Sequence, residues 1–90
     1  MVTWDEPKRQ ANLRKHGLDF AECEAVFDHP VFTTEDTRAA YGEQRIRLLG
    51  WLDGRVVRLT YTERGETLHV ISLREATRNE ARAYFKAISD

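Results

Sequence analysis

The sequence predicts a single α+β domain, and three observations lead to this expectation. The first third shows helix capping signals, the middle alternates apolar and polar residues with a period of two, and a capping box precedes the last helical segment. Ninety residues, 1–90, form one domain with room for one modest core. We therefore expect a twisted antiparallel sheet of three to four strands, with helices largely on one face.

Two N-terminal helices are expected after a short strand at residues 2–4. In the segment DEPKRQANLRKHG, Asp5 can cap the first helix, a proline suits its first turn, and Gly17 can close it in the left-handed conformation. The segment DFAECEAVFDH follows as a second helix and ends at Pro30. Its apolar stripe consists of Phe20, Cys23 and Phe27, with Val26 alongside.

The period then changes to two, which predicts the strands of the sheet. These strands span residues 31–38, 45–52, 55–63 and 67–74. Asp53 and Gly54 form the strongest hairpin signal, and turns are expected at AYGE (40–43) and at 64–66. The first strand reads as an edge strand, and the last, apolar on both faces for most of its length, as a central one.

A final helix is expected from the capping box of Thr77 and Glu80 to about Ser89. Its predicted buried stripe consists of Ala81, Tyr84, Phe85 and Ile88. A different face carries the cations Arg78, Arg82 and Lys86.

Composition excludes several classes of protein. The chain has 41% hydrophobic and 32% charged residues, and no apolar run approaches the roughly 20 residues of a membrane span. Cys23 is the single cysteine, so no internal disulfide can form, and no apolar signal segment begins the chain; both favour the cytoplasm. Three scattered histidines and one cysteine lack metal-ligand spacing, so neither a metal nor a cofactor is expected.

Charge is distributed unevenly, although the formal net charge is only −1. Residues 1–44 hold five Lys/Arg and nine Asp/Glu, whereas residues 45–90 hold nine and six. The basic side chains gather late in the chain as Arg58, Arg64, Arg74, Arg78 and Arg82. Guanidinium forks near a helix N-terminus suit phosphate, which makes LREATR a candidate anion site. The alternative is that Glu63, Glu75 and Glu80 engage these arginines in surface ion pairs.

Antiparallel pairing limits which arginines can meet. Arg64 closes one strand of a hairpin and Arg74 ends the other, so they are expected at opposite ends of the ladder, roughly 25 Å apart. A subset is therefore expected, in which Arg58 or a residue such as Arg47 approaches Arg74 and Arg78. His16 with Lys15 at a helix end, and His69 on a strand, are expected to be structural more often than catalytic.

Two long segments together resemble one protein family. WDEPKRQANLRKHGLDFAECEAVFDHP fits the pattern W-D-x-x-K-x-x-x-N-x-x-K-H-G-[VL]-x-F-x-E-A, with Cys23 in place of the usual alanine. GEQRIRLLGWLDGRVVRLTYTERGETLHVISLREATRNEARAYF fits the motifs G-E-x-R, G-R, T-x-R-G and I-S-x-R-x-A-[TS]-x-x-E in order. In both parts the chain resembles the BrnT family of toxins from type II toxin–antitoxin systems, over nearly all ninety residues.

The resemblance implies a RelE-like ribonuclease fold and a metal-independent endoribonuclease that cleaves RNA and inhibits translation. It also implies neutralisation by a ribbon-helix-helix antitoxin, a toxin–antitoxin heterotetramer, and binding to promoter DNA only through that complex. The alternatives are a non-catalytic protein-binding module, a corepressor acting only with its partner, and, more weakly, a direct DNA binder.

The resemblance also suggests site residues. RNA cleavage without a metal requires attack by the 2′-hydroxyl, charge relief on the phosphorane and two proton transfers. Motif positions match the basic residues Arg64, Arg74 and Arg78, which we expect to be catalytic, although Arg64 could equally contact the antitoxin. RNA-binding candidates are Arg58, Arg82 and Lys86. Candidates for proton transfer are Lys15, His16, Glu63 and Tyr84.

Overall fold

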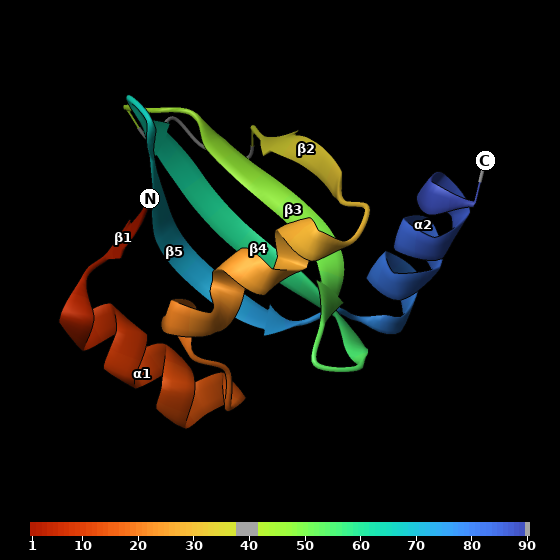
Figure 1. Cartoon of the computed structure of the whole chain (residues 1–90), viewed down its shortest axis with the longest axis horizontal. Coiled ribbons are helices and arrows are strands. Elements are labelled where there is room, and N and C mark those ends of the chain that lie inside the picture. The colour runs from red at the N-terminus through yellow and green to blue at the C-terminus, as the bar shows by residue number, and fades with distance from the viewer. Residues whose placement is uncertain (38–41, 90) are drawn as a thin grey trace.

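The computed structural model describes residues 1–37 and 42–89, which form a five-stranded mixed sheet and three helices (Figure 1). In chain order the elements are β1 (Val2–Trp4), α1 (Glu6–His16), η1 (Phe20–Asp28), β2 (Phe32–Asp36), β3 (Arg45–Leu52), β4 (Arg55–Arg64), β5 (Thr67–Glu75) and α2 (Arg78–Ile88). The predicted α+β class is confirmed. The expected turn at 40–43 lies partly outside the described residues.

The sheet order is β1-β5-β4-β3-β2, so β2 is an edge strand and β5 is central, as predicted. Strands β2 to β5 form the predicted antiparallel meander, and the short N-terminal strand β1 pairs with β5 in parallel, which makes the sheet five-stranded and mixed. The direction of β1 follows from α1, which comes directly after it and continues along β5. The register pairs Trp4 with Val70, and farther along the same strand Asn12 of α1 binds Leu73.

The predicted second helix is a 3₁₀ helix, and this changes which residues it buries. Side chains three positions apart eclipse each other in a 3₁₀ helix. Phe20, Cys23 and Val26 therefore form one line, and all three are fully buried. Phe27 lies off that line and is 47% exposed, which corrects the predicted apolar stripe. Burial raises the pKa of the Cys23 thiol to about 11, in agreement with its expected place in the core.

The hydrophobic core lies between the sheet and the two N-terminal helices. Figure 1 shows α1 and η1 together against the sheet, with α2 standing to one side. The close approach of η1 requires Gly50 on β3, since a Cβ there would lie 3.3 Å from Cβ of Val26. The core residues are Leu18, Phe20, Cys23, Val26, Leu48, Leu52, Val57, Leu59, Tyr61, Val70 and Leu73.

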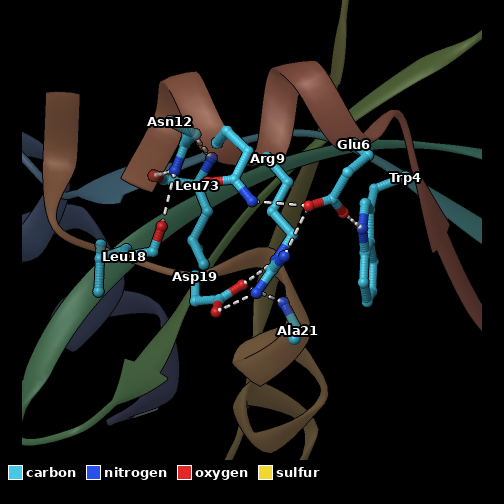
Figure 2. Close-up of polar contacts among 9 residues, drawn as sticks. Trp4, Glu6, Arg9, Asn12, Leu18, Asp19, Ala21 and Leu73 are labelled. Atoms are coloured by element: carbon cyan, nitrogen blue, oxygen red, sulfur yellow. Dashed lines mark hydrogen bonds and ion pairs between the residues drawn. The ribbon is translucent and has the colours of Figure 1, made fainter. Parts of the chain in front are cut away.

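Polar contacts anchor α1 to the rest of the domain (Figure 2). Asp5 caps the helix by accepting from the Lys8 amide at 3.3 Å, and Gly17 closes it with φ of 71°, both as predicted. Arg9 binds the carboxylate of Asp19 through Nε at 2.7 Å and Nη2 at 2.9 Å. The buried amide of Asn12 donates to the carbonyl oxygens of Leu18 and Leu73 and accepts from the Leu73 amide.

The β3–β4 hairpin turns at Asp53 and Gly54, as predicted. Both residues have positive φ, 52° and 78°, which is the requirement of the type I′ turn. The hairpin fixes the register from Leu52 opposite Arg55 to Ile46 opposite Tyr61. Its pairing therefore decides which side chains share a face of the sheet.

Helix α2 begins with the predicted capping box but packs differently from the prediction. Tyr84 is buried and Ile88 partly so, whereas Phe85 is 49% exposed and corrects the expected stripe. The Phe85 ring makes edge contacts with Trp51 and Tyr84 at centroid distances of 6.3 and 5.4 Å. Since Trp51 projects from the face of β3 opposite to the core residue Leu52, α2 does not share the face covered by α1 and η1.

Candidate functional site

Arginines of β3, β4 and β5 lie together on the face of the sheet that α1 and η1 leave uncovered. Arg58 of β4 pairs directly with Arg74 of β5 and with Leu49 of β3, and Arg47 lies two positions before Leu49. Cross-strand partners project from the same face, and alternate residues of a strand do likewise. The chain therefore gathers three guanidinium groups on one surface, which we call the arginine face (Arg47, Arg58 and Arg74).

Glu80, in the first turn of α2, binds two of these arginines. Its carboxylate accepts two parallel hydrogen bonds from Arg74, at 2.9 and 3.0 Å, and one from Nη1 of Arg58 at 3.1 Å. It also accepts from the Thr77 amide at 2.9 Å, while Oγ1 of Thr77 accepts from the Glu80 amide at 3.2 Å. One side chain thus caps α2 and attaches it to both β4 and β5.

The electrostatics of this cluster keep Glu80 ionised. Burial raises the pKa of its carboxyl, but hydrogen bonds from Arg74 and the Thr77 amide, with the charge of Arg74, lower that pKa to about 2. Burial and then the charge of Arg74 lower the pKa of Arg58, Glu80 acts in the opposite direction, and Arg47 lowers it further. Glu80 therefore offsets the repulsion between neighbouring guanidinium groups.

Replacing Glu80 by glutamine should change how the free energy of unfolding depends on pH. Because the pKa of Glu80 falls from 4.5 to about 2 on folding, its contribution is complete above pH 4.5 and is lost as pH falls to about 2. We expect E80Q to be less stable than the wild type by about 1–2 kcal/mol at pH 7, after allowance for solvent screening. Urea unfolding should show the difference shrinking towards pH 2; a constant difference would contradict this account.

A pocket of about 180 Å³ opens beside the arginine face. Its lining residues are Phe32, Thr34, Arg47, Leu49, Arg58 and Glu80. Nε of Arg47 is buried and has no hydrogen-bond partner in the structure. Within residues 1–37 and 42–89, Arg47 also makes no ion pair, in contrast to Arg58 and Arg74. The pocket thus combines one uncommitted cation with an aromatic wall.

The positive charge of Arg74 also acts on His16. His16 ends α1, where the contacts of Asn12 with Leu73 hold the helix to β5. Burial, followed by the positive charges of Lys15 and Arg74, lowers the pKa of His16 below its usual 6.5. The imidazole is therefore largely neutral at pH 7 and able to accept a proton, beside the exposed Lys15.

Two of the expected site residues lie at the far end of β4. Arg64 is six positions from Arg58, roughly 20 Å by strand rise, and it pairs with Glu43 at 3.1 Å. Glu63 lines a separate pocket with Phe27. The structure therefore does not bring Arg64 or Glu63 together with Arg74, in agreement with the separation that strand pairing predicts.

The candidates on α2 divide into exposed cations and one buried aromatic residue. Arg78, Arg82 and Lys86 are all exposed. Tyr84 is buried, and its hydroxyl donates to the carbonyl oxygen of Pro30 at 2.8 Å. Burial raises the pKa of the Tyr84 hydroxyl. Tyr84 thus attaches α2 to the segment after η1, away from the arginine face.

Comparison of the sequence with known protein families shows the class of protein to which the chain belongs. A family model described as the ribonuclease toxin BrnT of type II toxin–antitoxin systems matches residues 4–80. The chain belongs to the BrnT family. The resemblance seen in the sequence is thus confirmed, and BrnT membership assigns the chain an RNA substrate and an antitoxin partner. No curated protein matches the chain.

The BrnT match has a boundary that bears on the site. It includes the whole arginine face and Glu80, and it ends before Arg82 and Lys86.

The helices of residues 1–37 and 42–89 are all too short or too polar to span a membrane. In the same ranges, no three His, Cys, Asp or Glu side chains gather as metal ligands.

Sequence reasoning left Arg47 and Glu80 out of the predicted site residues. The hairpin at Asp53–Gly54 contained a signal for Arg47, because counting back from that turn sets Leu49 opposite Arg58 and places Arg47 on the same face. Glu80 was expected in the capping box and as one of three carboxylates that could pair with the arginines, but not as a site residue. Its contact with Arg58, 22 positions earlier, depends on where α2 packs and has no local signature.

Proposed function

We propose that this BrnT protein is a metal-independent endoribonuclease that uses the Arg58–Arg74 pair to stabilise charge on a scissile phosphate. The observation that supports the proposal is the pair of guanidinium groups held side by side across β4 and β5 by one carboxylate. Donors fixed in advance need no reorganisation as charge develops, which makes them effective in catalysis. Arg78, exposed at the first position of α2, adds a further cation nearby.

Arginine does not accept protons at neutral pH, so a second group must do so. In the proposed reaction His16 removes the proton of a 2′-hydroxyl, whose oxygen forms a bond to phosphorus as the bond to the 5′ oxygen breaks. The products are a 2′,3′-cyclic phosphate and a 5′-hydroxyl end. Lys15, next to His16 at the end of α1, is the candidate that returns a proton to the 5′ oxygen.

Incubation of the purified chain with RNA tests the proposed reaction. We expect cleavage in the presence of EDTA, with 2′,3′-cyclic phosphate ends detected by mass spectrometry. An oligonucleotide with 2′-O-methyl groups should resist cleavage, because its 2′ oxygen cannot act as nucleophile. Cleavage that stops in EDTA, or cleavage of the 2′-O-methyl substrate, contradicts the mechanism.

Replacing His16 by alanine should lower the rate of cleavage about 10²–10⁴-fold, the usual contribution of a general base or acid. In the wild type the rate should rise as pH increases through the pKa of His16, which lies below 6.5, and should be flat above it. The residual cleavage rate of H16A should not show this rise with pH. His29 is an exposed histidine on another segment, so H29A serves as the matched control and should retain both rate and pH profile.

Membership of a type II toxin family implies an antitoxin partner. We propose a ribbon-helix-helix antitoxin that neutralises the toxin in a heterotetramer, binding of promoter DNA through the antitoxin alone, and a cytoplasmic site of action in which RNA cleavage inhibits translation. Arg64, distant from Arg74 and paired with an exposed glutamate, is better placed for an antitoxin contact than for catalysis.

One observation favours a second candidate function, a non-catalytic module that only binds its partner. Glu80 already engages both Arg58 and Arg74, so these cations are partly neutralised within the fold. A tight antitoxin complex together with no RNA cleavage at high protein concentration would favour this candidate over the endoribonuclease.

A further inference from the structure

We propose that the pocket between Phe32 and Arg47 is a nucleotide subsite, in which Arg47 binds an RNA phosphate and Phe32 contacts the face of the adjoining base. Because the pocket borders the arginine face, this subsite rests on the proposed function and adds to it the group that holds the substrate strand. Glu80 fixes Arg58 and Arg74, whereas no carboxylate in the part of the chain that the structure describes pairs with Arg47.

The state of Arg47 is the first observation that supports the subsite. Within residues 1–37 and 42–89 it has no carboxylate partner, and its Nε is buried without a hydrogen bond. Protein covers that Nε, so a phosphate in the pocket would be bound by the terminal Nη donors of Arg47, which carry the same positive charge. A guanidinium group is also the side chain best matched to phosphate, through paired donors.

The positive local charge also supports a phosphate site in this pocket. The arginine face carries three guanidinium charges and Glu80 one negative charge, which leaves a local charge of +2 in a chain of net charge −1. The charge of Arg47 lowers the pKa of Arg58, so the two cations influence each other across the pocket. Two phosphates, one at the cleavage site and one beside it, would balance this charge.

The other wall of the pocket suits a base. The register pairs Phe32 with Leu49 and Thr34 with Arg47, so an aromatic ring and an aliphatic side chain lie beside the cation. Phe32 is half-buried on the edge strand, and Thr34 is exposed with its hydroxyl available to sugar or phosphate oxygens. Single-stranded RNA is commonly held by stacking of bases on aromatic side chains above a basic surface.

The size of the pocket is consistent with a small part of a polymer. Its volume of about 180 Å³ is below the roughly 300 Å³ at which sites for drug-sized ligands begin. It can therefore accept one group of a longer strand and not an enclosed cofactor. The adjacent strand β2 is an edge of the sheet, so an RNA strand can continue past the pocket.

Binding of a non-cleavable RNA tests the subsite independently of catalysis. The probe is a fluorescein-labelled single-stranded oligonucleotide with 2′-O-methyl groups, and the readout is Kd by anisotropy over a series of salt concentrations. We expect R47M to raise Kd at least tenfold and to reduce the salt slope by about one unit. F32A should raise Kd about five- to tenfold, and F32W should restore it.

The matched control is R55M, which also removes one arginine from the same sheet. Arg55 lies at the hairpin and pairs with Glu75, outside the pocket, so R55M should change Kd by less than twofold. Thermal melting confirms folding of each variant. Where R47M does not fold, R47K keeps the charge and removes the paired donors, and it should still weaken binding at least threefold.

The outcomes separate the subsite from the proposed reaction. Wild-type chain that binds the oligonucleotide through Arg47 and Phe32 but cuts no RNA would contradict the endoribonuclease and leave the subsite supported. Active wild type, with F32A and either R47M or R47K binding as tightly as R55M, overturns the subsite alone. Loss of antitoxin affinity in R47M with unchanged RNA affinity also overturns it, because the pocket would then hold a protein side chain.

Discussion

Replacing Arg74 by methionine should lower the rate of RNA cleavage about 10²–10³-fold, the usual cost of removing one preorganised donor from a developing anion. Arg74 donates two parallel hydrogen bonds to Glu80, which fixes its guanidinium group on the arginine face, and its charge acts on both Arg58 and His16. Methionine keeps much of the length of the side chain and removes its charge and donors. Initial rates at saturating RNA measure the effect.

The stability of R74M must be separated from its activity. Arg74 and Glu80 are 27% and 24% exposed, so loss of their two-pronged contact should cost about 1 kcal/mol. For a domain of this size that lowers Tm by about 4–8 °C, and the protein should remain folded at 25 °C. R74K keeps the charge but not the paired donors and should recover only part of the rate. R55M removes an arginine that makes a single, more exposed ion pair with Glu75 at 3.3 Å, and it should keep the wild-type rate. An R74M rate equal to that of R55M would exclude Arg74 from catalysis.

Much of the fold could be predicted because its signals are local. The Asp53–Gly54 turn, the Asp5 cap, the closing glycine of α1 and the capping box of α2 each depend on neighbouring residues, and all four were confirmed. Once the hairpin turn is known, pairing along β3 and β4 follows by counting. The same counting correctly separates Arg64 from Arg74.

The errors in the fold arise where packing overrides local pattern. Phe27 fits an α-helical stripe by spacing, but the segment forms a 3₁₀ helix whose period of three excludes it. Phe85 lies on the apolar stripe of α2. Because the helix stands to one side of the sheet, the rest of the domain buries only part of that stripe. Neither the helix type nor the docking position of α2 can be read from periodicity.

The candidate site was predictable in its location and not in its internal pairing. Sequence placed arginines near the start of α2, and the structure confirms that Arg58 and Arg74 meet there. The sequence left two roles open for these arginines, phosphate binding and pairing with carboxylates. The structure shows both arrangements on one surface. Glu80 engages Arg58 and Arg74, whereas Arg47 has no carboxylate partner among residues 1–37 and 42–89. That distinction depends on contacts between distant positions.

Replacing Asn12 by alanine should lower the free energy of unfolding by about 2–4 kcal/mol, because it leaves three buried backbone groups without partners. Its side chain donates at 3.0 Å to the Leu18 carbonyl and at 2.8 Å to the Leu73 carbonyl, and accepts at 3.2 Å from the Leu73 amide. Asn12 thereby supplies the hydrogen bonds that a longer β1 would have made to β5. Tm should fall by roughly 10–20 °C in thermal melts.

The same substitution should also affect catalysis, because His16 lies one helical turn after Asn12. With α1 no longer tied to Leu73, the end of the helix that carries His16 is held less firmly to β5, and the rate of the folded fraction should fall at a temperature well below Tm. Gln10 provides the control, because it is exposed on the same helix and, among the residues described, its side chain binds Glu6 alone. Q10A should change stability by less than about 0.5 kcal/mol. N12A as stable as Q10A would mean that Leu73 finds other partners, and that the end of α1 is positioned by its apolar contacts alone.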